Sequence, residues 1–373
     1  MDTSRAGWRA TGLACLVVAA LVATACASSP APSATDGPGT SDPGEQEPEA
    51  PEPDPEPDPA PPPEPDPEPE PEPVVDPAEV GANELGRIPV LMYHRLRDDG
   101  GSVYDLTPDE FRDELEWLFE HGYRPIRTVD LARGEIDVPA GTTPVVLTFD
   151  DSTREQAQLT ADGELAPDTA LGILVEIAAR YDDVEPHASV YVITSSLFGG
   201  GPDGPRIVAE LHDLGMEIGN HTHTHRNLGQ IADDEVVEEL RRAVAEIRAI
   251  VPEAEVATLS LPLGVFPQDR DLAARGSSPA GDYVHEGVLL VGAEPSPSPF
   301  HADFEPLAIP RIRTSPSWDH DAEPDYGSRF WLDWLDAEDG RRYVSDGNPA
   351  TVSFPAALLD DLDERYADRA NPY

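Results

Sequence analysis

The stretch Pro144-Val145-Val146-Leu147-Thr148-Phe149-Asp150-Asp151-Ser152 runs from β-prone apolar residues directly into two adjacent carboxylates. A short, continuous apolar run is typical of a strand that is buried on both faces, as in a parallel sheet. Two acids at its end are costly near a core unless a partner such as a metal ion compensates their charge. Because side chains alternate along a strand, Asp150 and Asp151 can face one cleft only if the chain turns there. The alternative for this stretch alone is a strand followed by a solvated acidic loop.

The N-terminus has the pattern of an export signal. Two arginines precede the apolar run 13–22, which is short for a membrane span and typical of a secretion signal. The run ends in Leu21-Val22-Ala23-Thr24-Ala25-Cys26, which resembles the lipobox of bacterial lipoproteins. This resemblance implies a signal peptide over residues 1–25 and a lipid on Cys26 that anchors the mature chain to a membrane. Plain secretion with cleavage nearby is the alternative.

A segment rich in Pro, Glu, Asp, Ser and Ala follows over residues 26–84. This composition cannot bury a core, so it predicts an extended, disordered linker. Residues 85–373 are then expected to form the folded domain. The formal net charge of the whole chain is −48. This charge argues against nucleic acid as a partner and is compatible with neutral or cationic sugars.

Strands and helices alternate in the folded part. Besides the opening stretch, apolar runs predict strands over residues 88–94, 189–193, 216–220 and 256–261. Apolar residues at helical spacing predict helices over residues 107–121, 171–181, 205–214 and 233–251. This alternation predicts parallel βαβ units and an α/β fold, either a barrel or a doubly wound sheet. In such folds the chemistry lies at the carboxyl ends of the strands.

Three histidines stand close together after a predicted strand, in His221-Thr222-His223-Thr224-His225. One helical turn would bring His221 and His225 to the same face, whereas an extended segment would add His223. One carboxylate and two imidazoles leave a position open for water, which is the pattern of a catalytic zinc site. Because both cysteines precede the mature domain, a metal site must use His, Asp or Glu. A set of structural histidines is the alternative.

The motif Thr148-Phe149-Asp150-Asp151, followed by His221-Thr222-x-x-His225, resembles the polysaccharide deacetylase family, the NodB-like carbohydrate esterases of family 4. The likeness covers about residues 88–264. It implies a distorted (β/α) barrel of the NodB deacetylase type and a zinc or other divalent transition metal ion held by Asp151, His221 and His225. It also implies that Asp150 is the general base that takes a proton from the water.

Two departures concern the groups around the base. Ser152 replaces the usual glycine of the first motif. The third motif of the family, Arg-x-Pro-Tyr/Phe-Gly, reads Ser260-Leu261-Pro262-Leu263-Gly264 and has lost its arginine. The backbone N–H of Leu263 can still serve as the oxyanion donor that this motif supplies. Arg311, in an Ile-Pro-Arg-Ile sequence, is the candidate substitute for the arginine.

The late Leu-x-His motif, which carries the general acid in the family, is also missing. The stretch Pro89-Val90-Leu91-Met92-Tyr93-His94 resembles the first strand of permuted members, the biofilm poly-N-acetylglucosamine deacetylases. There the acid histidine precedes the Asp-Asp motif, so the resemblance assigns this role to His94. The weaker candidates are His285, His301 and His320.

The resemblance therefore implies a metal-dependent hydrolase that removes acetyl groups from an N-acetylated polysaccharide. We expect a lipid-anchored monomer at the bacterial cell envelope. One alternative is an O-acetyl esterase acting on xylan-like glycans. Another is an inactive glycan-binding lipoprotein, which the missing arginine and Leu-x-His motif would favour. A glycosidase is disfavoured because adjacent strand-end acids would not straddle a glycosidic bond with a separation of about 5–9 Å.

Overall fold

The computed structural model describes residues 75–99, 101–292, 294–314, 326–337 and 340–373. The predicted signal peptide, Cys26 and most of the predicted linker lie outside these described residues. Among the helices of the described part, none has the length and apolar character needed to cross a membrane.

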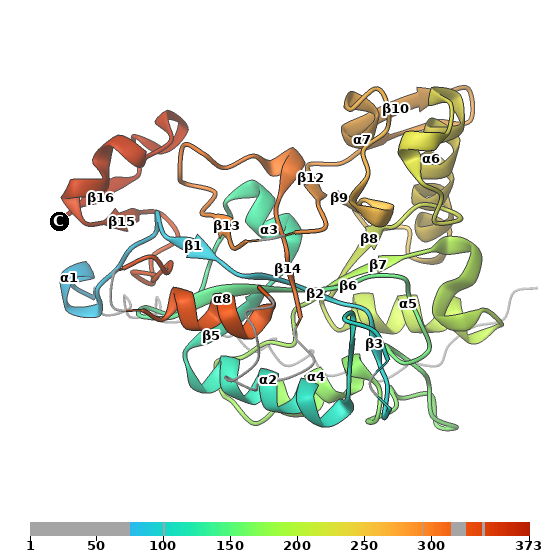
Figure 1. The fold of residues 1–373 in the computed structure, drawn as a ribbon, viewed down its shortest axis with the longest axis horizontal. Helices are drawn as coiled ribbons and strands as arrows, with labels where there is room; N and C mark the ends of the chain where they lie inside the picture. Colours follow the sequence, from blue (N-terminus) through green and yellow to red (C-terminus); the bar gives the residue numbers. More distant parts are fainter. Residues whose placement is uncertain (1–74, 100, 293, 315–325, 338–339) are drawn as a thin grey trace, which may run out of the picture. The chain divides into compact units, whose positions relative to one another are not determined.

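An eight-stranded parallel sheet forms the centre of the described part (Figure 1). Seven of its strands follow the spatial order β12-β9-β8-β7-β6-β2-β14. The eighth, β5, pairs with the first half of β6, whereas β7 pairs with the end of β6. All seven residues of β6 are buried, as the opening stretch predicted for a strand covered on both faces. The strands are β2 (Val90–Tyr93), β5 (Tyr123–Ile126), β6 (Thr143–Phe149), β7 (Ser189–Val192), β8 (Glu217–Asn220), β9 (Thr258–Ser260), β12 (Gly287–Leu289) and β14 (Ile312–Arg313).

The two edges of this sheet meet, so the sheet curls into a distorted barrel. Ile309, just before β14, forms a parallel bridge with Leu289 at the end of β12. The N–H of Ile309 donates to the carbonyl of Val288 over 2.8 Å, and the N–H of Leu290 donates to the carbonyl of Ile309 over 2.9 Å. The predicted α/β class and distorted (β/α) barrel are therefore confirmed.

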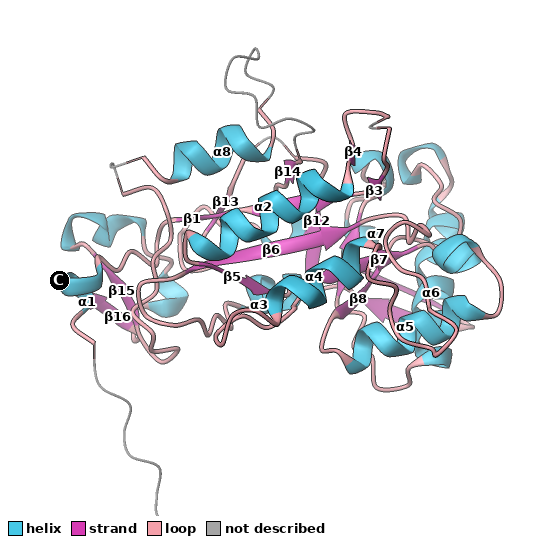
Figure 2. Cartoon of the chain, turned by 90° about the horizontal axis from the view of Figure 1, so that it is seen from below, coloured by secondary structure: helices cyan, strands magenta, loops and turns pink. Residues whose placement is uncertain are grey.

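Helices cover the outside of the sheet, and α2 and α4 lie side by side across β6 (Figure 2). Helix α2 begins as predicted, because Thr107 and Glu110 form a capping box. Its buried side chains include Phe111 and Leu115, which pack in the main core. The helices are α1 (Pro77–Val80), α2 (Pro108–Glu120), α3 (Thr128–Arg133), α4 (Ala170–Ala178), α5 (Asp203–Asp213), α6 (Asp233–Ile250), α7 (Asp271–Ala274) and α8 (Ser328–Leu335).

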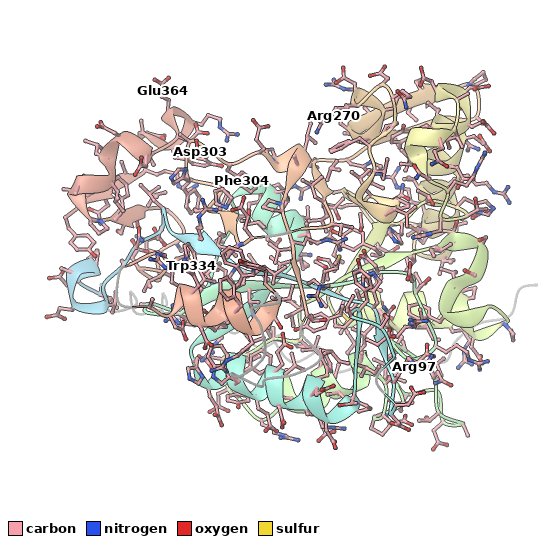
Figure 3. All side chains as sticks on the ribbon, in the orientation of Figure 1. Arg97, Arg270, Asp303, Phe304, Trp334 and Glu364 are labelled. Atoms are coloured by element: carbon pink, nitrogen blue, oxygen red, sulfur yellow. The ribbon has the colours of Figure 1, made fainter. Side chains whose placement is uncertain are left out.

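In the described ranges, four short strand pairs lie outside the barrel sheet. One of them, β10 with β11, is an antiparallel hairpin beside α6 that the Gly- and Ser-rich sequence did not predict. Charged side chains project from the surface, among them Arg97, Arg270 and Glu364 (Figure 3). The pairs are β1 (Arg87–Ile88) with β13 (Ser296–Pro297), β3 (Arg95–Leu96) with β4 (Asp105–Leu106), β10 (Arg275–Ser278) with β11 (Gly281–Val284), and β15 (Val352–Phe354) with β16 (Ala370–Pro372).

The packed part of the chain begins before the predicted linker boundary at residue 84. Glu84 is buried, and its carboxylate accepts a hydrogen bond from the Ser353 N–H over 2.7 Å and from the Tyr343 hydroxyl over 3.1 Å. Burial raises the pKa of Glu84 to about 7. Composition could not separate this glutamate from the acidic linker, because its partners lie more than 250 positions away in the sequence.

Candidate metal centre and active site

Asp151, His221 and His225 come together at the carboxyl ends of β6 and β8. Nε2 of His221 and Nε2 of His225 each lie 3.4 Å from Oδ1 of Asp151. One ligand atom from each of the three residues lies within 4.8 Å of the other two. The His221 side chain is only 2% exposed, whereas Asp151 and His225 are each 31% exposed. The cluster is therefore buried on one side and open to solvent on the other.

A turn directly after β6 separates the two acids of the opening stretch. Asp151 has φ 80° and Ser152 has φ 46°, both in the left-handed region. This is the turn that the sequence required, and its backbone geometry suits the glycine that the family places at residue 152. The Ser152 hydroxyl accepts a hydrogen bond from the Ile193 N–H over 3.2 Å, which ties the turn to the end of β7. Asp151 consequently reaches the open side while Asp150 stays buried.

The two histidines are not brought together by a helical turn. After β8 the chain forms an irregular loop in which Thr222 has φ 67° and His225 has φ 57°. The Thr222 hydroxyl accepts a hydrogen bond from the His225 N–H over 2.8 Å. His223, which the sequence left open as a third ligand, instead places Nδ1 2.9 Å from Glu246 and 3.0 Å from the Thr194 hydroxyl.

The cluster fits a divalent ion of the zinc type. A tetrahedral ion with bonds of about 2.0–2.1 Å separates its ligand atoms by about 3.3–3.4 Å. The two histidine–aspartate separations match this spacing. Nδ1 of His221 lies 2.8 Å from the Ser260 carbonyl, so it carries the proton. Neutral His221 then directs the lone pair of Nε2 towards a carboxylate oxygen, and a cation between the two atoms would be bound by both.

The pKa shifts at this cluster follow from burial and charge. Burial acts to lower the pKa of His221, but the carboxylates of Asp150 and Asp151 raise it overall. Burial and the neighbouring His221 lower the pKa of His225, which favours the neutral, metal-binding imidazole. Burial acts to raise the pKa of Asp151, but the neighbouring His221 lowers it overall.

Asp150 lies beside the cluster in a cage of donors. The Arg311 guanidinium donates from Nη1 to Oδ1 over 2.8 Å and from Nη2 to Oδ2 over 2.7 Å. Both side chains are almost completely buried. Burial acts to raise the pKa of Asp150, but the charges of Arg311 and His221 hold it well below its usual range. The structure therefore brings Arg311 to the carboxylate that the lost arginine of the third motif would hold.

Ser260 also contacts the predicted base, and the sequence reasoning missed it. Its hydroxyl donates to Oδ2 of Asp150 over 3.0 Å. Ser260 stands at the position of the missing arginine in the third motif, and that correspondence could have identified it. A serine hydroxyl carries no charge and cannot form an ion pair, so the charge of the carboxylate is compensated by Arg311.

His94 follows β2, which pairs directly with β6. Its Nδ1 is buried and has no hydrogen-bond partner among the described residues. Burial lowers the pKa of His94, against the raising effect of Asp150 and Asp151. The ring centroid of His94 lies 5.2 Å from that of Tyr104. Its role as the acid stays a prediction, supported by its place on the strand adjacent to the one that ends in Asp150.

Leu263 lies in the short 3-10 turn Pro262–Gly264 that follows β9. Its backbone is left-handed, with φ 59°, and its side chain is 62% exposed. The structure thus places this residue at the same rim as the strand ends that carry the cluster. Its role as an oxyanion donor stays a prediction.

The weaker candidates for the acid lie apart from the cluster or outside the described residues. His285 is buried, with Nδ1 2.7 Å from the Ala273 carbonyl and Nε2 3.2 Å from the side-chain nitrogen of Asn220. His301 accepts a hydrogen bond from the Asp303 N–H over 3.0 Å, on a different loop. His320 lies outside the described residues.

Comparisons with known proteins agree with the family resemblance. Residues 137–276 match the family model described as polysaccharide deacetylase. A search of curated proteins gave no match. Similar solved structures include a Streptococcus pyogenes deacetylase, PplD, in complex with acetate (20% identity, TM-score 0.47, 62% of this chain and 93% of that chain). They also include a putative polysaccharide deacetylase, BA0330, from Bacillus anthracis (20%, 0.48, 62% and 66%). IcaB from Ammonifex degensii is a third (18%, 0.45, 62% and 93%). The segment 137–276 of this chain thus matches the polysaccharide deacetylase family model, in agreement with the resemblance of its motifs.

Proposed function

We propose that this chain is a metal-dependent hydrolase that removes acetyl groups from N-acetylated glycans at the cell envelope. The observation that carries the proposal is the position of Asp150. It lies beside the Asp151, His221 and His225 cluster but outside it, and Arg311 keeps it ionised. A cluster that only stored a metal would have no use for a separate buried carboxylate held in this way.

Three residues of the chain would hold the metal, namely Asp151, His221 and His225. When bound, an ion of the zinc type supplies Lewis acidity and lowers the pKa of water. Ser260 fixes the orientation of His221 through its carbonyl. The identity of the ion belongs to the proposal, with zinc as the first choice for an Asp-His-His set.

Asp150 would take the proton from the attacking water. Among the described residues, its Oδ2 accepts hydrogen bonds from Arg311 and Ser260, whereas Oδ1 accepts one from Arg311. Oδ1 therefore keeps acceptor capacity for a proton. Arg311 and Ser260 also fix the direction of the carboxylate, so no reorientation is needed during the reaction.

The leaving nitrogen of an amide needs a proton, which His94 would donate. The backbone N–H of Leu263 would donate to the oxyanion that forms on the acetyl carbonyl. The contact between Arg311 and Asp150 supports an active enzyme over the inactive glycan-binding alternative, because that alternative rested partly on the missing arginine. An O-acetyl esterase uses the same residues, but it depends less on the acid.

We propose a neutral or cationic glycan as substrate, because the chain is strongly acidic. We also propose that a lipid on Cys26 and the Pro-rich linker hold a monomeric domain outside the cytoplasmic membrane. Both parts of this proposal rest on the sequence alone, and fractionation with radiolabelled lipid would test the anchor.

The experiment that tests the activity is Asp150→Asn, assayed for acetate release from N-acetylglucosamine oligomers, peptidoglycan and acetylxylan. We expect turnover to fall by about 10²–10⁴-fold, as for other lost proton-transfer groups, while the metal content stays unchanged. Asp303→Asn, which changes an exposed aspartate on another loop, is the matched control. Turnover within about threefold of the unchanged chain would contradict the proposal, and the circular dichroism spectrum would confirm that the variant is folded.

A further inference from the structure

Both imidazoles of the candidate metal centre belong to one strained loop, residues 221–225. Thr222 is β-branched and left-handed, and His225 is also left-handed. Non-glycine residues in this region are strained, and they persist only where the surroundings hold them. Something outside the loop must therefore fix its shape.

Helix α6 supplies the contacts that hold this loop, and Glu239 makes the most direct ones. One carboxylate oxygen of Glu239 accepts a hydrogen bond from the Thr224 N–H over 2.8 Å. The other accepts one from the Thr224 hydroxyl over 2.7 Å. The backbone carbonyl of Glu239 accepts a third from the His223 N–H over 3.2 Å. These bonds reach the residue that immediately precedes His225.

Glu239 is an unusual residue for its place on the helix. It is only 8% exposed and lies among the apolar residues that face inward, such as Val236 and Leu240. A carboxylate rarely occupies such a position unless it is hydrogen-bonded, because burying an unpaired charge is costly. Hydrogen bonds to an ionised acceptor are roughly twice as strong as neutral ones. The hydrogen bonds between Glu239 and the loop are therefore stronger than those that a neutral side chain would form.

Other contacts hold the first part of the same loop. The Asn220 side chain donates to the Leu240 carbonyl over 3.1 Å and accepts from the Thr222 N–H over 2.8 Å. Nδ1 of His223 lies 2.9 Å from a carboxylate oxygen of Glu246 on α6. Among the described residues, Glu239 is the one whose side chain accepts hydrogen bonds from Thr224, and it forms no hydrogen bond with the three ligands.

We propose that Glu239 is a positioning residue for the metal centre. Its carboxylate fixes Thr224 in the loop and so directs His225 towards Asp151. This inference rests on the proposed function in one respect, because it takes the Asp151, His221 and His225 cluster to bind a metal ion. Outer-shell partners of metal ligands are typically worth 10–100-fold in metal affinity.

The test measures metal affinity directly. Purified chain is stripped with a chelator and titrated with Co²⁺, followed by visible absorption, and with Zn²⁺ against a competing indicator. Glu239→Ala should weaken binding of both ions by about 10–100-fold and change the Co²⁺ absorption bands. Glu239→Gln should lose less metal affinity, because its amide oxygen can still accept a hydrogen bond from the Thr224 N–H. Glu238→Ala is the matched control, since Glu238 is the neighbouring, 56% exposed glutamate that pairs with Arg241. It should leave both readouts unchanged.

Each outcome decides between the two proposals. If Glu239→Ala folds and binds Co²⁺ with unchanged affinity and spectrum, the positioning role is overturned and the proposed function stands. If Glu239→Ala does not fold, Glu239→Gln and Thr224→Val take its place, and unchanged binding in both overturns the positioning role. If the unchanged chain binds neither ion, both the proposed function and the positioning role of Glu239 fail.

Discussion

Replacing Arg311 with methionine should destabilise the fold through the carboxylate that it leaves behind. In the structure Arg311 makes two hydrogen bonds to Asp150, one to the Thr148 hydroxyl over 3.1 Å and one to the Leu290 carbonyl over 2.7 Å. Its side chain is fully buried, and that of Asp150 is 3% exposed. Removing one partner of a buried ion pair typically costs 3–5 kcal/mol, because the other charge is left uncompensated. We expect a loss of about 3–5 kcal/mol in the free energy of unfolding at pH 7.

The loss should depend on pH with a defined sign. In the unchanged chain the folded-state pKa of Asp150 is depressed, so its contribution is present above the unfolded pKa and is lost as the pH falls. Without Arg311, burial should raise the pKa of Asp150, so ionising it costs stability as the pH rises. Because the folded-state pKa of Asp150 lies well below its usual range, the unchanged chain keeps this contribution at pH 4. The difference between the two proteins should therefore widen from pH 4 to pH 7, as Asp150 of the variant ionises.

Urea denaturation of chelator-treated protein at several pH values measures this difference. Asp150→Asn in the Arg311→Met background is the companion measurement, because that double variant carries neither buried charge. The double variant should lose clearly less free energy of unfolding than the two single variants lose in sum. A cost below about 1 kcal/mol at every pH, or strict additivity with Asp150→Asn, would refute the reasoning.

Two further predictions concern buried ionisable groups. His94→Gln should lower turnover of N-acetylated glycans by about 10²–10⁴-fold, but it should affect 4-nitrophenyl acetate much less, because that leaving group departs without a proton. Equal losses on both substrates, or unchanged metal-dependent turnover, would remove His94 as the acid. Burial raises the pKa of Glu114 to about 7, so the stability that this group contributes below its unfolded pKa of about 4.5 is lost as the pH rises to about 7. Glu114→Gln should therefore flatten the fall in urea stability over that range by up to about 3 kcal/mol. The parts due to Glu84, whose pKa is also about 7, and to Glu217, whose pKa burial also raises, should remain. The exposed neighbour Glu116→Gln should keep the full slope, and an equally steep slope in Glu114→Gln would contradict the assignment.

The elements with strong local signals were predictable from the sequence. The continuous apolar run before Asp150 is a buried strand, and the capping box at Thr107 begins α2. In both cases the information lies within a few neighbouring residues. The hairpin over residues 275–284 has no such signal, because its Gly- and Ser-rich strands bury few side chains. The hairpin packs against α6, and this tertiary contact cannot be predicted from a local sequence pattern.

The candidate site was predictable in its residue types and less so in its geometry. The motifs identified Asp151, His221 and His225, which the structure brings together. For the loop that joins the two histidines the sequence left a helical turn and an extended segment open, and the structure shows an irregular loop instead. Its left-handed residues depend on hydrogen bonds to α6, which no local pattern encodes. Arg311 was proposed only as a substitute, because spacing along the chain cannot show that β14 lies next to β2.

The meeting of the two sheet edges at Ile309 has a practical consequence for anyone who trims this protein. A fragment limited to the segment matched by the family model would keep every group of the candidate metal cluster. It would lose the first strand with His94 and the last strand with Arg311, and with them the seam that joins the ends of the sheet. Such a fragment could hold an ion and still be inert, so expression boundaries should be chosen by the ring of strands and not by the matched motifs.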